Sequence, residues 1–234
     1  MIMKAKTVLI AGAGGVLSQA VAKEFSQAGY TVIGIRRKKS KESLEQSTVY
    51  SQMHFCELHD RHAIQQVVDR ILVECGSIDV LVHNAAHLVM APFLEMNDAD
   101  FQESWRAALG SAVACAQAVL PSMLGHQAGA MIFSGATASL RGASQFAAFA
   151  AAKFGLRGLA QSLAREYQSQ GVHVAHVVID GLLRGSLSVP RFGGREENTI
   201  DPGLVAGTYR WLAEQPSSAW TLELDVRPSR SERF

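Results

Sequence analysis

The sequence predicts one α/β domain over residues 1–234, in which a doubly wound, seven-stranded parallel sheet carries helices on both faces. The length supports this, because 234 residues with 48% hydrophobic and 18% charged side chains suffice for one domain with a large core. Seven short apolar runs have the length of strands. They lie within Thr7–Ala11, Tyr30–Ile35, Met53–Cys56, Ser77–Ala86, Gly129–Ser134, Val172–Ile179 and Thr221–Val226. Helical patterns separate most of these runs, as parallel strands joined by crossovers require.

The first 35 residues read as a strand, a glycine-rich turn, a helix and a second strand. Thr7–Ala11 lacks polar alternation, which is typical of a strand buried on both faces. The turn exposes backbone N–H groups and a helix N-terminus, to which a pyrophosphate can bind. Its candidate cofactor-binding residues are Gly12, Gly14, Gly15 and Leu17. This unit predicts a Rossmann fold that binds a dinucleotide, and a glycine turn in a nucleotide-free fold is the alternative.

The end of the second strand is basic. In a dinucleotide fold, an acidic residue about 20 residues beyond the glycines binds the ribose 2′-hydroxyl of NAD. Here the chain reads Arg36-Arg37-Lys38-Lys39, with no acid. Guanidinium groups of Arg36 and Arg37 at this place attract a 2′-phosphate. The sequence therefore favours NADP(H) as the cofactor, and a solvated basic loop is the alternative.

Charge and cysteine content exclude several other classes of function. The net charge of +1 gives no reason to expect a nucleic-acid or acidic-membrane partner. The N-terminus imitates a signal peptide, but its apolar run is only as long as a strand. Cys56, Cys75 and Cys115 are odd in number and widely spread, so we expect free thiols and a cytoplasmic location. Cys56, His59 and His62 have ligand-like spacing without a fourth ligand, so we predict no metal site.

Gln145–Gly158 (QFAAFAAAKFGLRG) reads as a core helix and as one wall of an active site. It resembles the Tyr-x-x-x-Lys helix of the short-chain dehydrogenase/reductase family, with Phe149 at the tyrosine position and Lys153 in place. Positions i and i+4 share one helix face, so both side chains point into one pocket. The resemblance implies that the Lys153 ammonium holds the nicotinamide ribose. Phe149, however, has no proton to give.

The resemblance extends to the remaining cofactor contacts. Glu57-Leu58 is similar to the Asp-Val/Leu pair that contacts adenine, and His83-Asn84-Ala85-Ala86 is similar to the strand end Asn-Asn-Ala-Gly. Asp180-Gly181 stands where the family has Pro-Gly. The resemblance therefore implies cofactor contacts at Glu57, Leu58, Asn84, Ala85 and Gly181. The family's glycine-rich turn reads Gly-x-x-x-Gly-x-Gly, and counting from Gly12 places Val16 and Ser18 at its later glycines.

The family's other catalytic groups are missing at the matching positions. The usual serine falls on Ala136, and the asparagine of the proton relay falls on Ala108. With Phe149, three of the four groups are absent, as in an atypical bacterial branch that lacks the catalytic tyrosine. Substitute proton donors among the nearby residues are Ser134, Thr137 and Asp180. Of these, Ser134 is the candidate that we place beside Lys153 and Phe149 in the catalytic set.

Two functions follow from these residues. The first is an NADP(H)-dependent oxidoreductase that acts on a small carbonyl or alcohol, with residues 185–198 as a mobile flap over the substrate. The second is a catalytically silent dinucleotide-binding protein, acting as a sensor or partner subunit. The helices over 98–124 and 144–170 are rich in small apolar residues. In the resembling family these helices pair across a two-fold axis, which implies a homodimer or homotetramer; close packing within one subunit is the alternative.

Overall fold

The computed structural model describes residues 5–37 and 49–229. Its seven strands form one sheet in the order β3-β2-β1-β4-β5-β6-β7, and every neighbouring pair is parallel. The strands are β1 (Thr7–Ala11), β2 (Thr31–Arg36), β3 (Gln52–Phe55), β4 (Val80–His83), β5 (Gly129–Ser134), β6 (Val172–Ile179) and β7 (Glu223–Val226). The predicted doubly wound parallel sheet is therefore confirmed.

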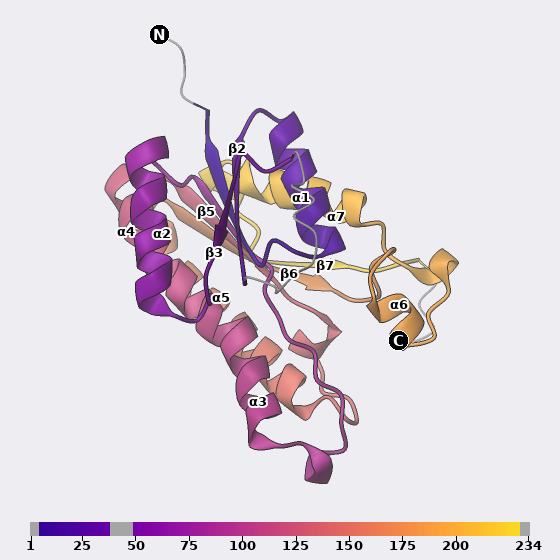
Figure 1. The fold of residues 1–234 in the computed structure, drawn as a ribbon. Coiled ribbons are helices and arrows are strands. Elements are labelled where there is room, and N and C mark those ends of the chain that lie inside the picture. Colours follow the sequence, from indigo (N-terminus) through magenta and orange to yellow (C-terminus); the bar gives the residue numbers. More distant parts are fainter. Residues whose placement is uncertain (1–4, 38–48, 230–234) are drawn as a thin grey trace.

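Helices cover both faces of the sheet (Figure 1). They are α1 (Val16–Gln27), α2 (Arg61–Cys75), α3 (Asp98–Trp105), α4 (Ser111–His126), α5 (Ala147–Tyr167), α6 (Ser188–Arg191) and α7 (Pro202–Ala213). One core lies between the sheet and the layer of α2, α4 and α5, and the other between the sheet and α1 with α7. Parallel strands that are buried on both faces need apolar side chains at successive positions, as in β6, which is buried throughout.

Local sequence sets the helix ends. Asp60 caps α2 by accepting from the backbone N–H groups of His62 and Ala63, and Gly76 ends the helix at φ +80°. Asp201 caps α7 in the same way, with Pro202 in its first turn. These caps fix the directions in which the connecting loops reach the carboxyl edge of the sheet.

The helix predicted over 98–124 is present in the structure, with a π-helical turn inside it. Asn97 caps α3, a π-helical turn follows over Arg106–Gly110, and α4 continues to His126. By length and composition alone, Asp98–His126 could cross a membrane, but 56% of its most apolar window is buried inside the fold. A core helix meets the same criterion, so the segment gives no support for a membrane protein.

The segment 185–198, predicted to lack regular structure, contains the short helix α6 and a 3₁₀ turn over Glu196–Asn198. Phe192, which follows α6, packs on Phe146 at the start of α5 with ring centroids 5.9 Å apart. The segment therefore rests on the N-terminal end of α5 in this structure. Whether it moves during function stays a prediction.

Candidate cofactor and active site

The site is built at the carboxyl edge of the sheet, where the order of the strands reverses between β1 and β4. Ligands of doubly wound folds bind at such switch points. The backbone N–H of Gly12 donates to the carbonyl of Ile35 at 2.9 Å, and that of Asn84 donates to the carbonyl of Ala11 at 2.8 Å. The glycine-rich turn is thereby held between the ends of β2 and β4.

Gly12 is required where it stands. Its φ is +93°, and a Cβ atom there would lie 2.6 Å from the backbone nitrogen of Ala85. Any side chain would therefore push the turn away from the chain at Asn84 and Ala85. Gly12, Asn84 and Ala85, which were predicted as cofactor contacts, lie together for this reason.

Ser18 already binds part of the turn that was expected to bind phosphate. Its Oγ accepts from the backbone N–H groups of Gly14 at 3.0 Å and Gly15 at 2.9 Å, and donates to the carbonyl of Gly15 at 2.8 Å. The first N–H groups of α1, those of Val16 and Leu17, have no acceptor within the helix. These two N–H groups are the anion-binding donors that the turn offers without rearrangement.

The two arginines after β2 have different surroundings. Arg36 lies over the ring of Phe55, with its guanidinium carbon 5.6 Å from the centroid, and its buried Nε has no hydrogen-bond partner within the described ranges. Arg37 instead forms an ion pair with Glu103 of α3 at 2.7 Å. Nε of Arg36 is thus an unsatisfied donor in the described part of this corner, and Lys38 and Lys39 lie outside the described residues.

Of the two predicted adenine contacts after β3, one is buried and the other is exposed. Leu58 is buried in the core under α2, and Glu57 is exposed, with an oxygen 3.9 Å from Nδ1 of His59. Gly181 follows β6, and a Cβ there would lie 3.0 Å from Pro228 and 3.1 Å from Ile200. Glu57 and Gly181 remain at the carboxyl edge, where a cofactor could touch them, whereas Leu58 serves mainly to anchor its loop.

Lys153 lies at the centre of the site. Its Nζ donates to the carbonyl oxygen of Ser134 at 2.7 Å and lies 5.7 Å from the centre of the Phe149 ring. The side chain is only 4% exposed, and burial lowers the pKa of Lys153 to about 8. The predicted sharing of one helix face by Phe149 and Lys153 is seen in the structure.

The prediction that the Ser134 hydroxyl takes part in catalysis is not supported by this geometry. Successive side chains of a strand point to opposite faces, and Ser134 points to the face that α7 covers. There its Oγ lies 2.8 Å from the hydroxyl of Tyr209 in a buried hydrogen bond. Only the backbone carbonyl of Ser134 reaches Lys153.

Two histidines that had no predicted role are buried beside the site. His83 on β4, Phe133 on β5 and His176 on β6 are register partners in one row under α4 and α5. His83 bonds to Ser111 at 2.7 Å, and His176 bonds to Glu223, its register partner on β7, at 3.0 Å. Side chains alternate between the two faces along a strand, so the sequence carried a signal that could have placed both histidines on this face.

Burial keeps both of these histidines neutral. Desolvation, and then the charge of Lys153, lower the pKa of His83 to about 3. Desolvation is also the largest cause that lowers the pKa of His176. Nδ1 of His83 and Nε2 of His176 are buried, and neither has a partner in the part of the chain that the structure describes. The Lys153 ammonium therefore stands near two neutral bases.

Thr137 and Asp180 form the remaining polar pair of the site. Oγ1 of Thr137 donates to Oδ1 of Asp180 at 2.6 Å, which joins the turn after β5 to the end of β6. Ala136 and Ala108 offer no polar side chain at the places of the family's serine and asparagine. The π-helical turn that contains Ala108 is present nonetheless.

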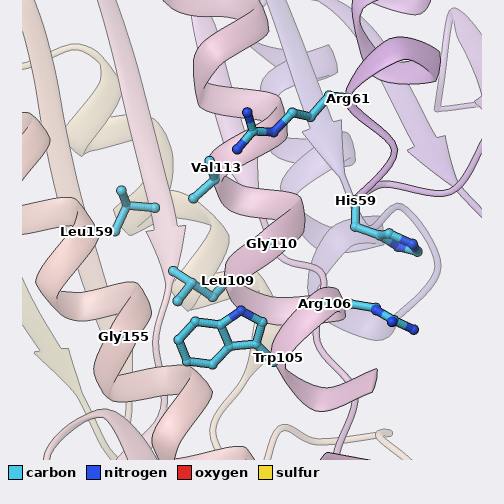
Figure 2. Close-up of a pocket in the computed structure, with 9 residues that line it drawn as sticks. All are labelled: His59, Arg61, Trp105, Arg106, Leu109, Gly110, Val113, Gly155 and Leu159. Atoms are coloured by element: carbon cyan, nitrogen blue, oxygen red, sulfur yellow. The ribbon is translucent and has the colours of Figure 1, made fainter. Parts of the chain in front are cut away.

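A separate groove of about 490 Å³ lies between α4, α5 and the start of α2 (Figure 2). Leu109 lies against α5, where a Cβ on Gly155 would be 2.8 Å from its side chain, and Arg61 and His59 form the opposite rim. None of the predicted cofactor or catalytic residues lines this groove. It therefore belongs to the outer surface of the helices and is distinct from the candidate site.

The family model for short chain dehydrogenases matches residues 6–183, which include the glycine turn and Lys153. The chain belongs to the short-chain dehydrogenase family. This is a family of oxidoreductases that bind a nicotinamide dinucleotide, and the predicted membership is confirmed. The match does not decide whether the chain falls in a branch that lacks the tyrosine.

Individual relatives agree with this membership. The chain is 26% identical over 236 aligned positions to the uncharacterized oxidoreductase YciK of Escherichia coli, covering 96% of this chain and 93% of that protein. It superposes on a short-chain dehydrogenase from Rhodopseudomonas palustris with a TM-score of 0.81 and 33% identity, covering 95% and 98% of the two chains. A short-chain dehydrogenase from Shigella flexneri, solved with NADP, gives a TM-score of 0.84 at 26% identity and coverages of 94% and 96%.

The residues of this chain fit a dinucleotide. Gly12 leaves no space for a Cβ, and the first N–H groups of α1 have no intrahelical acceptor. Arg36 carries a buried nitrogen that has no partner in the described part of the chain. Together they offer a close backbone approach, an anion site and a cation along one edge of the sheet. No cluster of metal-binding side chains occurs among residues 5–37 and 49–229.

Proposed function

We propose that the protein is an NADP(H)-dependent oxidoreductase of a small carbonyl or alcohol, in a branch of its family that works without the catalytic tyrosine. The choice of cofactor rests on the buried Nε of Arg36 at the end of β2, which has no hydrogen-bond partner among the described residues. A 2′-phosphate would satisfy this donor and neutralise its charge. NADH carries a 2′-hydroxyl there, which could accept a hydrogen bond but would leave the charge of Arg36 without a counter-charge.

The bound cofactor would supply hydride transfer, and the chain would position it. The N–H groups of Val16 and Leu17 would hold the diphosphate at the N-terminus of α1. Lys153 would hold the nicotinamide ribose through its ammonium, which stays buried beside the end of β5. Phe149 would pack against this part of the site without exchanging a proton.

The test is NADPH oxidation against a broad panel of small carbonyl compounds. We expect turnover of at least one compound, and its loss in Lys153→Ala, because the ribose would then lack its cation. Lys23→Ala on the exposed face of α1 is the matched control and should keep full activity. Tight NADPH binding without any turnover would instead favour the alternative, a catalytically silent dinucleotide-binding protein. The lack of a phenol at Phe149 is the observation that supports this alternative.

We further propose that the protein works as a homodimer or homotetramer in the cytoplasm. The groove beside α4 and α5 supports the oligomer, because Leu109, Val113 and Leu159 line it together with the ring of Trp105 (Figure 2). Trp105 is 46% exposed and Phe154 is 44% exposed. Large apolar side chains gathered on one surface are typical of a contact between subunits. A single monomeric species in sedimentation analysis would contradict this proposal.

A further inference from the structure

We propose that Thr137 and Asp180 form the acid–base pair that exchanges the substrate proton in place of the missing phenol. This proposal rests on the oxidoreductase function proposed above. It assigns the chemistry that Phe149 cannot perform to a hydroxyl and a carboxylate on neighbouring strand ends.

The pair lies at the correct edge of the sheet. Thr137 is three residues beyond the end of β5, and Asp180 directly follows β6. The two strands are hydrogen-bonded neighbours, and their pairing continues past β5, where the N–H of Gly135 donates to the carbonyl of Val177 at 2.7 Å. Lys153 binds the carbonyl of Ser134 at the same strand end. The ammonium and the pair therefore stand on one short stretch of the carboxyl edge.

The two side chains differ in exposure, which indicates which of them can contact a substrate. Asp180 is 8% exposed, whereas Thr137 is only partly buried. The hydroxyl can therefore meet a substrate while the carboxylate lies behind it. The backbone N–H of Asp180 donates to the carbonyl of Val226 at 2.8 Å, which ties Asp180 to the end of β7. A base held in place behind a hydroxyl is the arrangement that activates a hydroxyl for proton transfer.

Cationic side chains lie near the pair. Arg227 lies near Asp180, since the pKa of Arg227 is raised first by its bond to Asp225 and in part by the charge of Asp180. Lys153 supplies a second cation at the end of β5. A carboxylate can accept a proton, which the oxidative direction of the reaction needs.

The step balances in both directions. In alcohol oxidation, the substrate O–H proton passes to Oγ1 of Thr137 while the proton of Thr137 passes to Asp180. The C=O bond forms as the carbon gives its hydrogen, with the bonding electron pair, to the oxidised pyridine nucleotide. Carbonyl reduction is the reverse, and protonated Asp180 returns the proton through Thr137. Each turnover therefore gains or releases one proton at Asp180.

A purely structural tie between the two strand ends is the competing explanation, and conservative variants separate the two. Asp180→Asn keeps an oxygen that accepts from Thr137 but removes the base. Thr137→Ser keeps the hydroxyl, and Thr137→Val removes it. A structural tie tolerates Asp180→Asn and Thr137→Ser equally, whereas an acid–base pair tolerates only Thr137→Ser.

The experiment measures turnover with NADPH, the dissociation constants of NADPH and NADP⁺, and thermal unfolding for each variant. We expect Asp180→Asn and Thr137→Val to lower kcat by about 10²-fold or more, and Thr137→Ser to retain most activity. Asp69→Asn on the exposed face of α2 and Thr208→Val at a partly buried position of α7 are the matched controls and should leave kcat unchanged.

The dissociation constants give a readout that does not depend on turnover. Oxidised nicotinamide carries a positive ring, so removing a carboxylate beside it should weaken NADP⁺ binding at least threefold and leave NADPH binding unchanged. Full activity in Asp180→Asn, or an unchanged ratio of the two constants, would overturn the proposal. Failure of the wild-type protein to bind either nucleotide would instead overturn the proposed function itself, and this proposal with it.

Discussion

The Lys153 ammonium lies 2.7 Å from the carbonyl oxygen of Ser134, buried between α5 and the end of β5. A charge held in such a place disfavours folding, because burial lowers the pKa of Lys153 from 10.5 to about 8. A difference of this size corresponds to roughly 3 kcal/mol. We interpret it as stability given up for a cation at the cofactor site.

Lys153→Met should therefore stabilise the protein and abolish NADPH binding. At pH 7 we expect the free energy of unfolding to rise by about 1–2 kcal/mol, since the loss of the bond to Ser134 offsets part of the gain. The difference should fade as pH rises from about 8 to 10.5, where wild-type Lys153 loses its proton in the folded state and is relieved of the penalty.

Urea unfolding between pH 7 and pH 10.5 measures this prediction. Lys23→Met on the exposed face of α1 is the control and should change stability little. A folded Lys153→Met protein that is less stable than the wild type at pH 7 would show that the ammonium is well satisfied in its buried place.

Acid should destabilise the protein below about pH 6.5. His83, His173 and His176 all have pKa values lowered chiefly by desolvation, that of His83 to about 3. The unfolded chain binds protons at these residues while the folded protein does not, so stability is lost as pH falls. Each histidine adds up to about 1.4 kcal/mol per pH unit.

The contribution of His83 can be isolated by His83→Asn. The slope of the unfolding free energy against pH, measured in urea from pH 7 to pH 5, reports the number of protons taken up on unfolding. In this variant that number should be smaller by nearly one. His62→Asn on the exposed side of α2 serves as the control. An unchanged slope in His83→Asn would mean that His83 is protonated in the folded protein.

Restoring the family's hydroxyl groups should increase activity. The ring of Phe149 already lies 5.7 Å from Nζ of Lys153, so Phe149→Tyr with Ala136→Ser places a phenol beside the cation that lowers its pKa. We expect kcat for carbonyl reduction to rise by about tenfold or more, because a positioned acid contributes roughly 10²–10⁴. Phe154→Tyr, on the exposed face of the same helix, should gain nothing.

Ser18→Gly should tighten NADPH binding at the expense of stability. The variant frees the N–H groups of Gly14 and Gly15 for the diphosphate, so we expect the dissociation constant to fall severalfold. Loss of the bonds of Ser18 and the added glycine should lower the free energy of unfolding by about 1–2 kcal/mol. Calorimetric titration and thermal unfolding measure both effects.

Ser26→Gly near the other end of α1 separates the two contributions. It carries a similar cost in helix propensity, yet it lies far from the turn, so its affinity for NADPH should stay unchanged. Equal affinities for wild type and Ser18→Gly would contradict the view that Ser18 competes with phosphate for these N–H groups.

The sequence predicted the order of strands and helices because buried parallel strands leave an uninterrupted apolar run. The bounds of β1, β5 and β6 match the predicted runs residue for residue. The π-helical turn between α3 and α4 could not be predicted, since Arg106–Gly110 has no glycine or proline before its last residue. Apolar periodicity continues through it.

The sequence predicted where the site lies in the fold. It predicted the partners of the individual side chains less well. The strand ends placed Gly12 and Asn84 together, and the helical spacing placed Lys153 on one face with Phe149. The ion pair of Arg37 with Glu103 depends on where α3 packs, which no local pattern specifies. Ser134 was misplaced because its neighbourhood in the sequence does not say which face of β5 its side chain takes.

The most direct test is the affinity of the purified wild-type protein for NADPH and NADH, measured by calorimetric titration beside Arg36→Gln. We predict that NADPH binds at least tenfold more tightly than NADH and that Arg36→Gln removes most of this preference, because its guanidinium is the unsatisfied donor for the 2′-phosphate. Arg70→Gln on exposed α2 should leave both affinities unchanged. Equal affinities for the two nucleotides, or no binding of either at millimolar concentration, would contradict the account.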